Sequence, residues 1–98
     1  MHIKIHKSYR TVVALCDSEL LGKRFEQGIL QLDIRKNFYE GEEISEEQAL
    51  RLIEKHARED ATFNIVGKEA VQAALKAGII SDEGISKIAG IPYALKLL

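Results

Sequence analysis

Residues 45–78, SEEQALRLIEKHAREDATFNIVGKEAVQAALKAG, contain the patterns of a helix, a strand and a second helix in direct succession. Ser45 with a glutamine three residues later is the pattern of a capping box, and it predicts a helix over 46–59. The β-prone run 62–66 ends at a glycine, and the alanine-rich segment after it favours another helix, 68–78. This unit indicates a sheet that is covered by helices.

The sequence before this unit predicts a hairpin, a short helix and a third strand. Residues 2–7 alternate between apolar and polar side chains, and residues 11–16 form a β-prone run, so we expect the two to pair as a β-hairpin. Residues 19–27 place leucines and a phenylalanine on one helical face, and Gly28 suits the left-handed residue that ends a helix. Residues 30–34 alternate again, which is typical of a half-buried strand.

The remaining segments are a polar loop, a last helix and an apolar tail. Residues 36–44 are expected to form the loop, and the Ser-Asp-Glu start of residues 81–88 predicts the short helix. The tail, residues 91–98, is expected to be an edge strand, because Pro92 has no backbone N–H to donate inside a sheet.

This order of elements, β-β-α-β-α-β-α-α-(β), predicts an α/β (α+β-like) fold in a single domain over residues 1–98. We expect a mixed sheet of four to five strands that starts with the N-terminal β-hairpin, with helices packed on the sheet. The 98 residues, 46% hydrophobic and 30% charged, suffice for one core and exclude a large enzyme with a separate cofactor domain.

The charges are balanced overall but unevenly distributed along the chain. Lys and Arg number 14 against 15 Asp and Glu, so the net charge is -1. Residues 1–39 hold seven basic and four acidic side chains, whereas residues 40–60 hold eight acidic and three basic ones. The overall charge gives no general attraction to nucleic acid or acidic membranes, but we expect an electrically two-sided protein.

Cysteine usage and hydropathy indicate a cytoplasmic protein without a membrane segment. Cys16 is the only cysteine, so no internal disulfide or zinc ribbon can form, and a reducing compartment fits best. No apolar run approaches the roughly 20 residues that span a bilayer, and the first residues lack the apolar core of a signal peptide. No cofactor or metal is predicted, because His2 and His6 on one strand lie roughly 13 Å apart.

Basic side chains in the N-terminal part carry the leading functional hypothesis. They would form a surface that contacts RNA phosphates, with one tyrosine available for base stacking. The same side chains would also suit an ordinary solvated exterior. We therefore expect a non-enzymatic binding module whose partner is RNA or a ribonucleoprotein. The residues of this surface are Lys4, Lys7, Tyr9 and Arg10 on the hairpin, and Lys23 and Arg24 on the helix predicted next.

Two other hypotheses compete with this one. Cys16 and Asp17 stand at a strand end that leads into a helix, where a thiol can be activated, and Gly67 with Lys68 begins a helix whose N–H groups can attract an anion. These residues would serve a small enzyme or a ligand-binding protein, although a single glycine is also an ordinary strand-to-helix turn. The third hypothesis is a homo-oligomer joined through the C-terminal strand, where Ile91, Tyr93, Leu95 and Leu97 alternate.

Three strings of the sequence resemble a known family. They are KIHKSYRTVVALCDSELLGK at residues 4–23, NFYEGEE at 37–43 and ATFNIVG at 61–67. Together they resemble a family of small archaeal proteins defined as domain of unknown function 424, and the resemblance covers nearly the whole chain. It implies a stand-alone cytoplasmic archaeal protein and transfers no established activity. A role in information processing, such as translation, would fit that setting.

Overall fold

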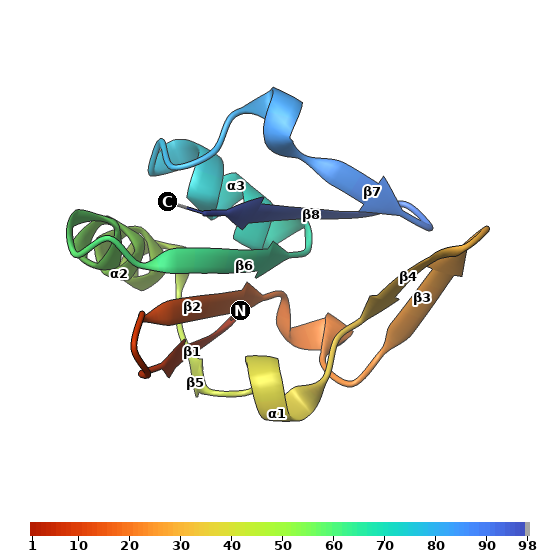
Figure 1. Cartoon of the computed structure of the whole chain (residues 1–98), viewed down its shortest axis with the longest axis horizontal. Helices are drawn as coiled ribbons and strands as arrows, with labels where there is room; N and C mark the ends of the chain where they lie inside the picture. Colours follow the sequence, from red (N-terminus) through yellow and green to blue (C-terminus); the bar gives the residue numbers. More distant parts are fainter. Residues whose placement is uncertain (98) are drawn as a thin grey trace.

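The structure, a computed structural model, describes residues 1–97 and is built around a six-stranded mixed sheet. The strands lie in the order β5-β1-β2-β6-β8-β7 (Figure 1). β2 and β6 are parallel, and the other neighbouring pairs are antiparallel. The predicted mixed sheet with its N-terminal hairpin is confirmed, with six strands rather than four or five. The bounds are β1 His2–His6, β2 Val12–Cys16, β5 Glu42–Glu43, β6 Thr62–Val66, β7 Ser86–Ile88 and β8 Ile91–Lys96.

Two helices, α2 (Glu46–Arg58) and α3 (Lys68–Lys76), cover one face of this sheet as predicted. α2 begins with the expected capping box, in which the Ser45 hydroxyl accepts from the N–H of Gln48 and the Gln48 side chain accepts from the N–H of Ser45. The apolar faces of both helices pack on the inward side chains of the strands. That core includes Val13, Leu15, Ile53, Phe63, Ile65 and Val71.

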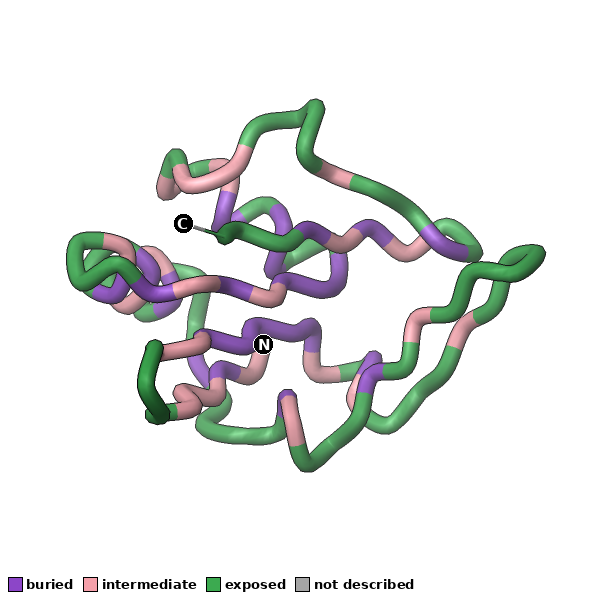
Figure 2. Tube along the Cα trace, viewed as in Figure 1, coloured by how far each residue is buried: buried purple, intermediate pink, exposed green. Residues whose placement is uncertain are grey.

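Shorter elements cover the opposite face. They are the 3-10 helix η1 (Ser18–Leu20), the helix α1 (Lys36–Tyr39) and a separate two-stranded sheet of β3 (Arg24–Gln27) and β4 (Leu30–Asp33). Because side chains alternate along a strand, the second core on this face comes from the other residues of the same strands. It includes Ala14, Cys16, Leu20, Ile34, Tyr39 and Val66. β2 is therefore buried on both faces, as the purple colour along it shows in Figure 2.

The predicted helix over 19–27 is wrong, because this segment forms η1 and then strand β3. Gly28 does have a positive φ, 62°, but it stands in the two-residue turn that joins β3 to β4 rather than at a helix end. Phe25 lies opposite Leu32, and both pack on the second core, so pairing with the predicted strand outweighs a weak helical pattern.

Two further segments differ from the sequence-based expectation. The loop expected over 36–44 contains the one-turn helix α1 and the short strand β5. The helix expected over 81–88 is limited to the 3-10 turn η2 (Asp82–Gly84), after which the chain forms β7. Ala89 and Gly90, both with positive φ, make a tight turn that pairs β7 with β8, and this pairing buries Ile88.

The tail is the strand β8, but the edge position expected for it is wrong, because β8 lies between β6 and β7. The carbonyl of Pro92 accepts from the N–H of Gly67 at 2.8 Å, just beyond the end of β6. The nitrogen of a strand residue points to the same side as its carbonyl, so the missing N–H of Pro92 also faces Gly67. The carbonyl of Gly67 already accepts from Val71 in α3, and the proline therefore leaves no ladder bond unmade. Leu98 lies outside the described residues.

Candidate functional site

A cavity of about 330 Å³ opens where the two parallel strands end. β2 is followed by Asp17 and β6 by Gly67, so both turns lie at the same end of the sheet. The carboxyl ends of parallel strands are the usual place for ligands in open sheets. The cavity is lined by Asp17, Glu19, Leu20, Gly67, Lys68, Glu69, Ile91 and Pro92.

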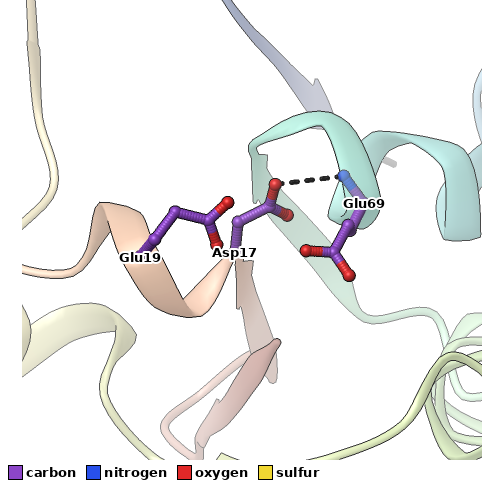
Figure 3. A group of neighbouring side chains, drawn as sticks. All are labelled: Asp17, Glu19 and Glu69. Carbon is purple, nitrogen blue, oxygen red and sulfur yellow. Dashed lines mark hydrogen bonds between the residues drawn. The ribbon is translucent and has the colours of Figure 1, made fainter.

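Asp17 ties this end of β2 to the start of α3. Its side chain is buried, and its carboxylate accepts from the N–H of Ala70 at 2.8 Å and from the N–H of Glu69 at 3.1 Å (Figure 3). These are N–H groups that a helix leaves unsatisfied in its first turn, so Asp17 caps α3 from 52 and 53 positions away in the sequence. Gly67 has φ 107°, and a Cβ at that position would collide with the Asp17 carboxylate.

Three carboxylates meet beside this cap. Asp17, Glu19 and Glu69 each offer one oxygen, and these oxygens all lie within 4.8 Å of one another (Figure 3). Burial raises the pKa of Asp17, and the charge of Glu19 raises it further, against the lowering effect of the two hydrogen bonds from α3. Hard cations favour oxygen ligands of this kind, so these are the residues that could hold a divalent metal ion in the cavity.

Gly67 and Lys68, the predicted anion-binding residues, both line this cavity. The N–H groups of Glu69 and Ala70 are already used by Asp17, so two of the donors that an anion would need at this helix start are occupied. The carboxylates of Asp17, Glu19 and Glu69 also repel negative charge. The electrostatics of the cavity therefore oppose the predicted anion site.

Cys16 does not take part in this cavity. The thiol is fully buried and donates to the carbonyl of Asp17 at 3.1 Å. Burial raises its pKa to about 12, with a further contribution from Asp17, so the thiol stays protonated at neutral pH. His2 is the cross-strand neighbour of Cys16, but one of its ring nitrogens contacts the carbonyl of Gly41 and the other lies 3.9 Å from Glu43. The hypothesis of a nucleophilic thiol is thus wrong.

The polar side chains of β1 are engaged with the segment that covers them. His2, Lys4 and His6 alternate with Ile3 and Ile5, and each contacts a backbone carbonyl. Lys4 donates to the carbonyl of Asn37 at 2.8 Å, and the ring of His6 contacts the carbonyl of Phe38 and stacks on the Phe38 ring. Lys4, one of the predicted RNA-contacting residues, therefore also holds α1 against the sheet.

The other predicted binding residues fall into two groups at opposite ends of the sheet. Lys7, Tyr9 and Arg10 lie in or next to the loop that precedes β2, and all three are exposed. Lys23 and Arg24 follow the far end of β2, at the start of β3. Five strand residues separate the two ends, a span of roughly 16 Å, and Figure 1 shows the β1–β2 loop and β3 on opposite sides of the molecule.

Lys23 and Arg24 gain two basic neighbours at the base of the β3–β4 hairpin. The N–H of Ile34 donates to the carbonyl of Lys23, which places the residues after β4 beside the start of β3. Lys36 packs over Gly22, where a Cβ would lie 3.1 Å from its Cε. We call Lys23, Arg24, Arg35 and Lys36, all exposed, the hairpin-base cluster. The sequence signal that could have revealed this cluster is Gly28, because a glycine with positive φ is also typical of a two-residue hairpin turn.

These features define a small α+β protein with a mixed sheet covered on both faces, a capped helix start beside an acidic cavity, and a basic cluster on a projecting hairpin. The chain belongs to the family described as protein of unknown function, DUF424, which it matches over residues 5–97. It is similar to the crystal structure of an uncharacterized conserved protein from Methanopyrus kandleri, with 26% identity and a TM-score of 0.87 over 96% of this chain and 87% of that chain. No curated protein sequence shows a significant match.

No helix among residues 1–97 has the length and the apolar character needed to cross a membrane.

Proposed function

We propose that this chain is a non-enzymatic binding protein that docks on RNA, free or within a ribonucleoprotein, through the hairpin-base cluster. The observation that supports it is the backbone pairing that brings two segments with four exposed cations, residues 23–24 and 35–36, to the base of one hairpin. Clustered Lys and Arg side chains on one face are the electrostatic footprint of proteins that contact nucleic-acid phosphates.

The charges of this cluster remain available to phosphates. Arg24 lies 3.6 Å from Glu26, and Arg35 lies 3.1 Å from Asp33, but these pairs are exposed and such pairs contribute little energy. Lys23 and Lys36 form no ion pair within the described part of the chain. A phosphate can therefore replace the weak intramolecular partners without loss of structure.

A retardation experiment at two salt concentrations tests this proposal. The native chain is titrated against total archaeal RNA and against ribosomal subunits, and the affinity is expected to fall steeply as salt rises. The double variant Lys23→Glu/Lys36→Glu is expected to weaken binding by about tenfold or more, since each lost phosphate contact removes part of the electrostatic term.

The matched control is Lys7→Glu/Arg10→Glu, which makes the same change in net charge at the opposite end of the sheet. It is expected to bind RNA within about twofold of the native chain if the contacts are local. Equal loss in both variants would show attraction by net charge alone, and no retardation of the native chain at low salt would remove the proposal.

The competing hypothesis is a small enzyme or ligand-binding protein. The cavity beside Asp17 and Gly67 is still available to it, but the buried thiol of Cys16 does not line that cavity. The residues that line this cavity include no histidine, cysteine, serine or threonine, and the Asp17 carboxylate is already engaged with α3. The binding proposal is therefore the better supported of the two.

A further inference from the structure

The outer edge of β1 is only half covered. β5 pairs with His2 and Ile3, and no strand among the described residues pairs with the outer side of β1 from Lys4 to His6. The carbonyl of Met1 accepts from the N–H of Ile44 at 2.8 Å, so the backbone groups of residue 1 point outward. Backbone direction alternates along a strand, and the N–H and C=O of Ile5 therefore point outward as well, with no backbone partner in the described chain.

A cavity of about 280 Å³ lies at this open edge, between β1 and α2. Its apolar lining comes from the inward side chains of β1 and from one side of the helix. Edge strands are usually blunted or covered, because unpaired backbone groups invite another strand. Here the unpaired N–H and C=O of Ile5 lie beside a cavity that can accept a side chain of an added strand. The cavity is lined by Ile3, Ile5, Lys7, Glu42, Leu52, Lys55 and His56.

The charges that line this cavity are mostly positive. Its one carboxylate belongs to Glu42, the first residue of β5. Lys7 and Lys55, both exposed, form no ion pair with any described residue. His56 lines the same cavity as both lysines. Burial lowers the pKa of His56, and Lys55 and Lys7 lower it further, against the raising effect of Glu59. The lining therefore carries two lysines without an ion pair against one carboxylate, that of Glu42.

We propose that the open half of β1 accepts an extended acidic peptide segment as an additional strand, with an apolar side chain in the cavity and carboxylates against Lys7 and Lys55. The backbone of Ile5 would supply the main-chain hydrogen bonds, and the cavity beside Leu52 would take one apolar side chain of the peptide. Lys7 and Lys55 line the same cavity, so the carboxylates that meet them stand on the same face of the peptide, two residues from the apolar side chain. Strand addition between an edge strand and a helix needs all of these features in one place, and the open half of β1 has them.

This surface is separate from the hairpin-base cluster. Lys7 adjoins the β1–β2 loop, whereas Lys23 and Lys36 lie beyond the other end of β2. The peptide proposal therefore does not rest on RNA binding, and either can fail without the other.

The test is an amide NMR titration of the full chain with an acetylated, amidated peptide of sequence Glu-Ser-Val-Ser-Glu, in which the valine and both glutamates lie on one face of a strand. The amide resonances of Ile5, Lys7 and Leu52 are expected to shift with a saturable dependence on peptide concentration. A peptide of sequence Lys-Ser-Val-Ser-Lys is expected to cause no saturable shift. The variant Lys7→Glu/Lys55→Glu is expected to weaken binding of the acidic peptide by about tenfold, and Lys23→Glu/Lys36→Glu to leave it within about twofold.

Backbone methylation of the probe separates strand addition from simple charge attraction. In an added strand only every second peptide N–H faces β1, so N-methylation of one alternate set is expected to abolish binding and methylation of the other set to preserve it. Equal binding of both methylated peptides, or shifts that map to the hairpin-base cluster, would overturn the proposal. Concentration-dependent shifts at Ile5 without peptide would show that a second copy takes this edge, and would overturn it too.

Discussion

At the scale of single residues, the carboxylate of Asp17, and not the neighbouring thiol of Cys16, connects the end of β2 to α3. Asp17 satisfies two N–H groups of α3 and lies where a side chain at position 67 would have to go. Cys16, one residue earlier, points into the second core and is sealed there. Cys16 therefore has a packing role and no nucleophilic one, because alternation along the strand turns its thiol inward.

The replacement Glu19→Gln is expected to lower the pKa of Asp17. Burial is the larger cause and remains, so the pKa of Asp17 should stay above its ordinary value of 3.8. Because the folded state holds the proton to higher pH than the unfolded chain, the contribution of Asp17 to the free energy of unfolding falls as pH rises from 3.8 through the raised pKa. In the variant this fall should be smaller.

Carbon NMR titration of the Asp17 carboxyl group measures this shift directly. Glu26→Gln, on the exposed side of β3, is the control and should leave the Asp17 pKa unchanged. An unchanged or higher pKa of Asp17 in Glu19→Gln would contradict the charge contribution.

At the scale of elements, the β3–β4 hairpin is the part of the fold that creates a candidate interface. It places Lys23 beside the residues that follow β4, and it packs Phe25 and Leu32 on the second core. Gln27 also accepts from the N–H of Ala89 at 2.7 Å, so the hairpin touches the β7–β8 turn as well as the sheet. Two isolated strands are marginally stable, and these contacts are what keep this pair in place.

Gly28→Ala is expected to destabilise this hairpin by about 1 kcal/mol, because alanine resists the positive φ of the turn. Amide exchange of Gln27 and Leu30 should accelerate by about fivefold, as that energy implies. Gly84→Ala is the matched control, since its Cβ would meet open space and its φ is not positive. Equal exchange in the two variants would show that the turn conformation is not what limits the hairpin.

At the scale of the whole molecule, two candidate interfaces lie at opposite ends of one sheet. The hairpin-base cluster follows the end of β2, and the open half of β1 adjoins its start. The reversal of Lys23 and Lys36 tests the RNA interface and is the control for the peptide interface. The reversal of Lys7 and Lys55 tests the peptide interface, and the reversal of Lys7 and Arg10 is the control for RNA binding. The two proposed interfaces therefore do not overlap.

The variant Leu95→Lys tests self-association through the C-terminal strand. Deletion of this strand would not be a clean test, because β8 is an interior strand and its loss would disrupt the sheet. β7 pairs only with residues 91–93, and Leu95 is exposed beyond that pairing. A dimer joined there should show twice the monomer mass in light scattering and return to the monomer in the variant. Ile29→Lys, at the exposed tip of the β3–β4 hairpin, is the control and should keep the native mass. A native chain that is already monomeric would contradict self-association.

The central unit could be predicted because its signals are local. The capping box at Ser45, the run that becomes β6 and the helix after Gly67 each follow from a few neighbouring residues. The helix prediction for residues 19–27 was wrong because a short apolar pattern fits a helix and an inward-facing strand equally well. Pairing of β3 with β4 decided between the two. For the candidate site, separate local patterns single out Asp17 and Gly67, but their contact spans 50 positions of the chain and no local pattern reports it.

The sequence by itself determined the mixed sheet, its N-terminal hairpin, the two long helices and the presence of unevenly distributed charges, since periodicity, capping and composition act over short distances. Only the tertiary structure decided that β8 is interior, that Asp17 caps α3, that Arg35 and Lys36 join Lys23 and Arg24, and that β1 is half open. Each of these depends on which distant segments pack side by side, and that choice is made by burying the whole apolar surface at once rather than by any single stretch of chain.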